Sequence, residues 1–352
     1  MNYECFDHWE KKIFLVDMKK EEDKHFSQLF DKGIKKYLGQ KKKIWILINK
    51  KGFDSWVICR HCWNIPYCDC CSVAINYHLL ENGDKIGICH ICKTQYAYPN
   101  KCEKCGHEEM FEYGIWTQKL AQLLKEKYWA ESILVESESV NSLNKIEKVK
   151  GKFQDLVNLG TPPILIWTSL LTTPIKGRDL DLLVFFDADI WLNIPDYNAN
   201  EKNFYFLYEA FVKHHCKSFI VQTLNPDHYS IRYACALKKE DFIKEENQFR
   251  MANVYPPYWE MCLILYKDEI EEKLYRKVDQ LYKELLYLQE KYQLKEMEIY
   301  TTPALIYKVF WKYRYNIILK GKEVRNFMDI VYSKLALNKK GFKVNWMPES
   351  IV

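Results

Sequence analysis

Eight cysteines of this 352-residue chain form four pairs in which two residues separate the members: Cys59/Cys62, Cys68/Cys71, Cys89/Cys92 and Cys102/Cys105. This spacing turns two thiolates toward one ion within a single tight turn, and four thiolates complete a tetrahedral zinc site. Eight ligands therefore predict two bound Zn²⁺ ions. The alternative is that reduced, unliganded cysteines repeat the spacing by chance.

The predicted metals are structural. Thiolates fill all four coordination positions of each site, so neither keeps the open position that a catalytic zinc needs. Metal binding, worth roughly 10–16 kcal/mol for a structural zinc, would then supply the folding free energy of this poorly apolar segment. Cys70 lies inside the second pair and is not expected to be a ligand, whereas His61, His90 and His107 are possible substitutes.

On both sides of the cysteine pairs, apolar strands alternate with helical stretches. A helix is expected within "QLFDKGIKKYLG" and another near 116–127. Strands are expected at "KIWILI", "SILVE" (132–136), "PILIW" (163–167), "DLLVFF" (181–186) and "KSFIVQT" (217–223). Continuous apolar runs are typical of strands covered on both faces of a parallel sheet. The predicted fold class is α/β with a cysteine-rich insertion.

A different pattern follows in the C-terminal part. The strand "EMCLILY", a long amphipathic helix, the strands "MEIYTT" and "YNIILKG", a helix through Val331 and the strand "FKVNWM" succeed one another. This β-α-β-β-α-β order predicts an α+β, ferredoxin-like domain. The expected domains are residues 1–54 and 111–237 for the α/β lobe, 55–110 for the cysteine-rich module and 238–352 for the C-terminal domain.

The basic character of the chain belongs to its C-terminal part. The net charge is +5, yet residues 307–343 carry ten Lys/Arg against Glu323 and Asp329. Aromatic residues interleave with these charges, as on a surface that follows phosphates and stacks bases. The alternative is a half-buried strand with its aromatic side chains inside and solvated charges outside. The candidate DNA-binding residues are Lys308, Trp311, Lys312 and Arg314.

The chain shows no sign of a membrane or secreted protein. No stretch approaches the roughly 18 apolar residues of a membrane span, and the N-terminus lacks the pattern of a signal peptide. We therefore expect a cytoplasmic protein. In that compartment clustered cysteine pairs bind metal more often than they form disulfides.

The sequence resembles the C-terminal half of the primosomal protein N′ family, the PriA replication-restart helicases. The likeness rests on "VDMKKE", "INKKGF", the order and spacing of the cysteine pairs, "DADIWLNIPDYNANE", "QTLNPDH", "YPPY" and "KYRYNIILKG". The resemblance implies a RecA-like second lobe of a superfamily 2 helicase, interrupted by a two-zinc insertion. It also implies that the first and fourth pairs (Cys59, Cys62, Cys102, Cys105) share one zinc and that the second and third (Cys68, Cys71, Cys89, Cys92) share the other.

The chain departs from the family at the motifs for ATP hydrolysis. It contains no G-x-x-x-x-G-K-[ST] loop to cradle a triphosphate. Where the family reads Q-V-x-G-R-A-G-R, this chain reads "EAFVKHHC", with Lys213 and Cys216 at the arginine positions. Trp116 and Trp167 replace glycines, and Ser169 replaces a glutamine. We expect a pseudo-helicase with no catalytic or cofactor-binding residues for ATP, because neither lysine nor cysteine replaces the planar fork of an arginine finger.

The resemblance therefore implies a DNA-binding protein of replication restart and primosome assembly, associated with the nucleoid. The implied partners are branched or single-stranded, fork-like DNA, the tail of the single-stranded-DNA-binding protein, and primosome proteins. One alternative is the second-lobe subunit of a split ATP-dependent 3′–5′ DNA helicase, completed by a separate first-lobe chain. Another is a zinc-stabilised adaptor that does not touch nucleic acid.

Overall fold

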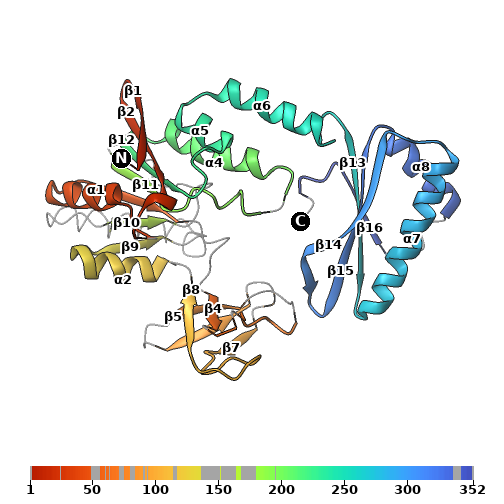
Figure 1. The fold of residues 1–352 in the computed structure, drawn as a ribbon, viewed down its shortest axis with the longest axis horizontal. Coiled ribbons are helices and arrows are strands. Elements are labelled where there is room, and N and C mark those ends of the chain that lie inside the picture. The colour runs from red at the N-terminus through yellow and green to blue at the C-terminus, as the bar shows by residue number, and fades with distance from the viewer. Residues whose placement is uncertain are drawn as a thin grey trace. The chain divides into compact units, whose positions relative to one another are not determined.

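The computed structural model describes residues 2–23, 25–48, 56–59, 61–62, 64–70, 75–79, 84–89, 92, 94–113, 117–135, 151, 164–167, 180–194, 196–335 and 342–350. The chain folds as two compact units (Figure 1). The first comprises Met1–Ser55, Gly114–Ile194 and Ala199–Lys244. The second comprises Trp56–Tyr113, Pro195–Asn198 and Glu245–Val352.

A seven-stranded sheet forms the centre of the first unit, in the order β1-β2-β12-β11-β3-β10-β9. Its strands are β1 (Tyr3–His8), β2 (Lys11–Asp17), β3 (Ile44–Leu47), β9 (Ser132–Val135), β10 (Ile164–Trp167), β11 (Leu180–Phe185) and β12 (Cys216–Thr223). Strands β2, β12, β11, β3, β10 and β9 run parallel to their neighbours, and β1 pairs with β2 in an antiparallel hairpin. The expected parallel sheet is thus present, with an additional hairpin at one edge.

Helices cover both faces of this sheet, which explains the continuous apolar runs of its strands. On one face α1 (Gln28–Gly39) and α2 (Thr117–Tyr128) pack against residues such as Ile44 and Ile46. On the other face α4 (Ala199–Lys213), α5 (Tyr229–Cys235) and the first turn of α6 (Lys239–Ala252) pack against Trp45 and Leu47. Successive side chains of β3 therefore enter two different cores, since strand side chains alternate between faces.

The cysteine-rich segment of the second unit forms two small antiparallel sheets. Strand β4 (Trp56–Cys59) pairs with β8 (Met110–Tyr113). Strands β5 (Asn76–Leu79), β6 (Lys85–Ile88) and β7 (Gln95–Ala97) form the other sheet. Cys59 ends β4, and the described cysteines of the other pairs, with Cys62, lie in the segments between these strands.

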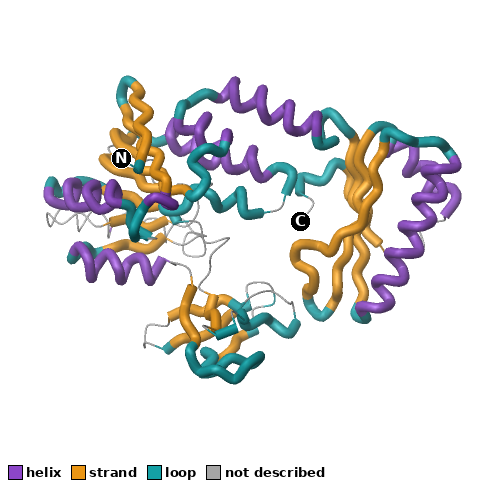
Figure 2. The backbone as a smooth tube through the Cα atoms, viewed as in Figure 1, coloured by secondary structure: helices purple, strands orange, loops and turns teal. Residues whose placement is uncertain are grey.

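The C-terminal part of the second unit is an antiparallel sheet of order β14-β15-β13-β16. Figure 2 shows the strands of this sheet in orange with purple helices along one side. The elements along the chain are β13 (Glu260–Asp268), α7 (Glu271–Lys291), β14 (Met297–Val309), β15 (Lys312–Gly321), α8 (Val324–Leu335) and β16 (Phe342–Trp346). Apolar residues of both helices pack on one face, led by Leu274, Leu281 and Leu285 of α7 and Phe327 of α8. The observed β-α-β-β-α-β order is the ferredoxin-like order that the sequence predicts.

None of the helices that the structure describes is both long and apolar enough to cross a membrane.

Candidate metal centres

A repeated backbone turn presents the cysteine pairs. The backbone N–H of Cys59 donates to the carbonyl of Asn64 at 3.0 Å, and that of Cys89 to the carbonyl of Thr94 at 2.9 Å. The N–H of Cys102 donates in the same way to the carbonyl of His107 at 2.7 Å. In each case the acceptor follows five residues after the first cysteine. Three pairs therefore sit in similar turns, as expected where two thiols must point to one side.

Four thiols meet in the first cluster, which consists of Cys59, Cys62, Cys102 and Cys105. All four Sγ atoms lie within 4.8 Å of one another. The Sγ atoms of Cys59 and Cys105 are 3.6 Å apart, and those of Cys62 and Cys102 are 3.5 Å apart. These distances exclude a disulfide, whose sulfurs are about 2.05 Å apart. They are close to the separation of about 3.8 Å that a zinc–sulfur distance of about 2.3 Å gives in a tetrahedron.

Glycine helps to close the turn of the first cluster. Gly106 adopts a left-handed φ of 74° directly after Cys105, and its N–H donates to the carbonyl of Cys102 at 2.8 Å. Such a φ strains most residues with a Cβ, so glycine is favoured here. The turn then returns the chain to β8, whose Met110 pairs with Cys59 on β4.

The second cluster contains Cys68, Cys89 and Cys92, whose Sγ atoms also lie within 4.8 Å of one another. Cys68 and Cys92 are 3.6 Å apart. The predicted fourth ligand, Cys71, lies outside the described residues, as does His90. Both clusters can hold a metal ion, and their donor sets suit zinc.

Polar neighbours surround the second cluster. The Tyr96 hydroxyl donates to the sulfur of Cys68 at 3.1 Å, and the Thr94 hydroxyl lies 3.1 Å from the sulfur of Cys92. Burial alone raises the pKa of the Cys92 thiol. Hydrogen bonds from the side chain and backbone of Thr94, and from Cys89 and Cys68, outweigh burial and lower it to about 6. A thiol with this pKa is largely a thiolate at pH 7, the form that binds metal.

The two described histidines beside the first cluster stack on each other and add no ligand to it. The rings of His61 and His107 are 4.7 Å apart with an interplanar angle of 20°. Cys70 belongs to neither thiol cluster in the described part of the chain, and its side chain is buried in the small core of this segment.

The candidate DNA-binding residues lie at the turn between β14 and β15. Phe310 and Trp311 form this turn in left-handed conformations, with φ of 48° and 65°, and their side chains are 60% and 59% exposed. Exposed aromatic rings at a turn are available for stacking. The alternative that places every aromatic of this segment inside is therefore wrong for these two residues.

The three basic candidates differ in their environments. Lys308 donates to the carbonyl of Asp69 at 2.9 Å and lies 4.9 Å from the ring centroid of Trp311. Lys312 is exposed, and its ammonium lies 3.8 Å from a carboxylate oxygen of Glu269. Arg314 is partly buried, burial lowers its pKa, and its Nε has no hydrogen-bond partner among the described residues. Lys312 is thus the most accessible cation of the set.

The residues at the expected arginine-finger positions lie at the amino end of strand β12. Lys213 ends helix α4 and pairs with Glu209. Cys216 begins β12, and burial raises the pKa of its thiol to about 12. Trp116, Ser169 and residues 176–179 lie outside the described residues.

A buried acidic network at the carboxyl ends of β11 and β12 was not predicted from the sequence. Asp189 is 2% exposed and accepts hydrogen bonds from the hydroxyl of Thr223 at 2.6 Å, the N–H of Leu224 at 2.6 Å and the amide of Asn225 at 3.1 Å. Burial and the charge of Asp189 raise the pKa of Asp187 to about 6, even though the N–H of Asp189 donates to it. The segments "DADI" and "QTLN" provide this network, so their polar residues were the available signal.

Sequence comparisons relate the chain to replication restart proteins. No family model matches the chain. The chain is 27% identical to the replication restart protein PriA of Borreliella burgdorferi over 319 residues, which are 88% of this chain and 46% of that protein. It is 27% identical to PriA of Bacillus subtilis over 73% of this chain and 32% of that protein. For PriA of Chlamydia trachomatis the identity is 27%, over 95% of this chain and 44% of that protein.

The fold and the thiol clusters define a mixed α/β protein with a parallel sheet and a cysteine-rich, metal-competent insertion. Over most of its length the chain is similar to part of several PriA proteins. It spans 32–46% of the length of the relatives named above.

Proposed function

We propose that this chain binds DNA in replication restart and primosome assembly, with two structural zinc ions and without hydrolysing ATP on its own. The observation that carries the proposal is the similarity to PriA proteins over 73–95% of the chain. The relatives are named for the process, replication restart.

The two thiol clusters support the zinc part of the proposal. The first has four sulfurs at spacings that fit a tetrahedral zinc, and the second has three, to which Cys71 would add the fourth. Such ions supply folding free energy to the segment around them and leave no coordination position for a substrate. We therefore infer that the zinc ions shape a binding surface and do no chemistry.

Our proposed domains are residues 1–54 with 111–237, 55–110 and 238–352, of which the first is a RecA-like second helicase lobe. Forked or single-stranded DNA is the proposed principal partner. Further proposed partners are the tail of the single-stranded-DNA-binding protein and primosome proteins. A replication role places the chain in the cytoplasm, at the nucleoid. The split-helicase alternative, which needs a separate first-lobe chain, is not favoured, because Lys213 and Cys216 occupy the two positions where the family has arginines.

The test is titration of a fluorescent forked DNA with purified, zinc-loaded chain at several salt concentrations. We expect saturable binding that weakens as salt rises, since phosphate contacts release counterions. Anisotropy that stays flat at micromolar protein in 50 mM salt would contradict the proposal. Phosphate release measured in the same samples should stay at background, and DNA-stimulated hydrolysis would favour the helicase alternative.

A further inference from the structure

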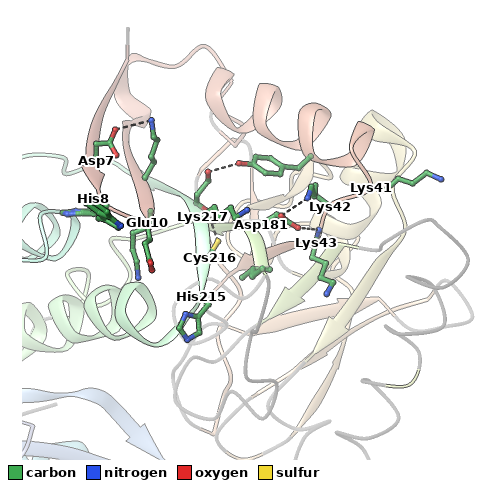
Figure 3. Close-up of a pocket in the computed structure, with 16 residues that line it drawn as sticks. Asp7, His8, Glu10, Lys41, Lys42, Lys43, Asp181, His215, Cys216 and Lys217 are labelled. Atoms are coloured by element: carbon green, nitrogen blue, oxygen red, sulfur yellow. Dashed lines mark hydrogen bonds and ion pairs between the residues drawn. The ribbon is translucent and has the colours of Figure 1, made fainter.

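A wide groove lies at the amino ends of the parallel strands in the first unit. Its volume is about 1020 Å³, and it is lined by the turn between β1 and β2, by Lys41–Lys43 before β3, by Leu180 and Asp181 of β11 and by the start of β12. In Figure 3 the hairpin with Asp7 lies on one side and Lys41–Lys43 on the other, and Cys216 and Lys217 lie between them. Among the residues that the structure describes, none of the clustered cysteines and none of the β14–β15 turn lines it.

The strand register explains why basic residues gather here. Lys12 of β2 pairs with Ser218 of β12, Ser218 with Leu182 of β11, and Leu182 with Ile44 of β3. Because these strands are parallel, the residues that precede this row all reach the same edge of the sheet. The residues that precede β2, β3, β11 and β12, although far apart in the sequence, therefore place their polar side chains together in the groove.

The groove carries an excess of positive charge. It is lined by six lysines (Lys11, Lys12, Lys41, Lys42, Lys43, Lys217) and three carboxylates (Asp7, Glu10, Asp181). Lys12 pairs with Asp7 at 3.2 Å and Lys42 with Asp181 at 3.4 Å. Lys11 donates to a carbonyl in the last turn of α4 at 2.7 Å. Half of the lysines are thus engaged within the protein.

The other three lysines, Lys41, Lys43 and Lys217, pair with no carboxylate of the described residues. Lys41 and Lys217 are exposed and Lys43 is half-buried. Like charges gathered on one concave surface repel one another, so such a cluster costs stability unless an anion binds. Lysines without a carboxylate partner among the described residues, gathered in one groove, attract the negatively charged phosphates of a nucleic-acid strand.

The excess of positive charge in the groove is not explained by neutralisation of the partial negative charge at helix C-termini. Helices α1 and α4 both end at this edge, where cations are favourable near the last carbonyls. Each helix already carries a lysine in its last turn, Lys36 in α1 and Lys213 in α4, and Lys11 bonds directly to α4. The free lysines come in addition to these.

An exposed indole stands at the rim of the same groove. Trp9 lies in the turn between β1 and β2, lines the groove and is fully exposed, at 102%. A single exposed tryptophan needs no explanation by itself. Beside free lysines, however, it provides the second element of a single-strand site, a face on which a base stacks.

We infer that this groove binds the phosphate backbone of a single DNA strand, with Lys41, Lys43 and Lys217 on the phosphates and Trp9 on a base. The inference rests on the proposed DNA-binding function and adds to it a site on the first unit. The ligand is a nucleic-acid strand because such a strand offers both repeated phosphates and aromatic bases, and it is DNA because the proposed function is DNA binding.

The test compares the salt dependence of oligothymidine binding by the zinc-loaded full chain and two triple variants. Lys41→Ala/Lys43→Ala/Lys217→Ala removes the proposed phosphate contacts. Lys32→Ala/Lys125→Ala/Lys244→Ala removes the same charge from the first unit outside the groove. The slope of log K against log salt should flatten by about 2 in the groove variant, at about 0.7 per single-strand contact, and stay unchanged in the control.

Trp9→Ala tests the stacking half of the inference. It should weaken binding by about fivefold to a hundredfold while leaving the salt slope unchanged. Because Trp9 is fully exposed, the melting temperature should not change. If the groove triple variant folds poorly, the exposed pair Lys41→Gln/Lys217→Gln replaces it, with an expected flattening of about 1.4.

The outcomes separate this inference from the proposed function. Absence of DNA binding by the unmodified chain would overturn both. Binding by the unmodified chain, with equal slopes for the groove and control variants, would overturn the groove alone. An acidic polypeptide that binds the groove variant and the unmodified chain equally well does not use the groove, and the assignment of the groove to DNA stands. A groove that binds this polypeptide and not DNA would contradict that assignment.

Discussion

The backbone N–H of Trp311 donates a hydrogen bond of 3.1 Å to the carbonyl oxygen of Cys70. Lys308 adds a second bond, of 2.9 Å, to the carbonyl of the adjacent Asp69. Both acceptors lie in the turn that follows Cys68, a member of the second thiol cluster. The β14–β15 turn, which carries the candidate DNA-binding residues, is therefore held by the turn that a metal would organise.

Metal removal should loosen the β14–β15 turn. An ion at the second cluster would hold the carbonyls of Asp69 and Cys70 in place. Chelation of this ion should then free the two groups that donate to them, the Lys308 ammonium and the Trp311 N–H. Amide hydrogen exchange in a peptide covering residues 306–314 should then accelerate by about tenfold or more, since local opening controls exchange. Peptides from the middle of α7 are the internal control and should not change. Complete loss of metal with full protection of 306–314 would show that the two turns are independent.

Substitution of single cysteines should distinguish the metal ligands from cysteines that only lie near them. Native mass spectrometry of the unmodified chain should give two zinc ions, and Cys59→Ser should give one, with unfolding of the first cluster. Cys70→Ser is the matched control and should keep two, because the Cys70 thiol belongs to neither cluster in the described part of the chain. A metal content near zero or near four in the unmodified chain would contradict the two-site model.

The chain should not hydrolyse ATP alone. It contains no phosphate-binding loop, and its expected finger positions are an exposed lysine paired with Glu209 and a buried thiol. Phosphate release with forked DNA should equal that of the buffer, with and without Lys213→Ala. DNA-stimulated release that Lys213→Ala abolishes would show that Lys213 replaces an arginine functionally.

Asp187 should make the chain less stable as the pH rises from about 4 to about 6. Burial raises its folded-state pKa to about 6 from an ordinary 3.8, so the unfolded chain loses this proton first and gains stability relative to the folded chain. Asp187→Asn removes the charge and keeps an oxygen for the N–H of Asp189. The variant should be more stable by about 1–3 kcal/mol at pH 7.5, and the difference should disappear near pH 4. A gain that does not depend on pH would assign the effect to packing.

The sequence predicted the regular elements well, because their apolar patterns are local. The strands "ILIW" and "LDLLVF" and the helix with Leu274 and Leu281 lie where periodicity placed them. The β1–β2 hairpin was missed because "YECFDHWEKKIFLVD" mixes charges into both strands and pairs through an edge that only the assembled sheet provides. Domain boundaries and individual site residues remain predictions.

The site was predictable only as far as spacing carries information. The cysteine pairs are visible in the sequence, since a thiolate pair needs one tight turn. The sharing of one cluster by Cys59 and Cys102 followed from family resemblance, because nothing local relates the two. The bond from Lys308 to Asp69 and the groove with Lys41 and Lys217 depend on contacts between distant segments, which no local pattern encodes.

The β14–β15 turn provides the most direct test of the proposed DNA-binding function. Trp311 and Lys312 are exposed there, and Lys308 lies beside the indole. Two lysines of this turn, Lys308 and Lys312, are replaced in the measurement below. Its matched control is Lys283→Ala/Lys291→Ala on α7, which also removes two positive charges from exposed positions. Trp311→Ala should weaken binding by about 1–3 kcal/mol with little change in salt slope or melting temperature, as expected for a stacking group that is not buried.

The deciding measurement is the affinity for forked DNA between 50 and 300 mM salt, for the unmodified zinc-loaded chain and for Lys308→Ala/Lys312→Ala. The unmodified chain should bind, and the slope of log K against log salt should flatten by roughly 1.4 to 1.8 in the variant, at about 0.7 to 0.9 per phosphate contact. Binding by a folded variant with unchanged affinity and slope would move the contact surface to Lys101 and Lys104 or to Lys93, which lies outside the described residues. No binding by the unmodified chain at any salt would contradict the proposed function itself.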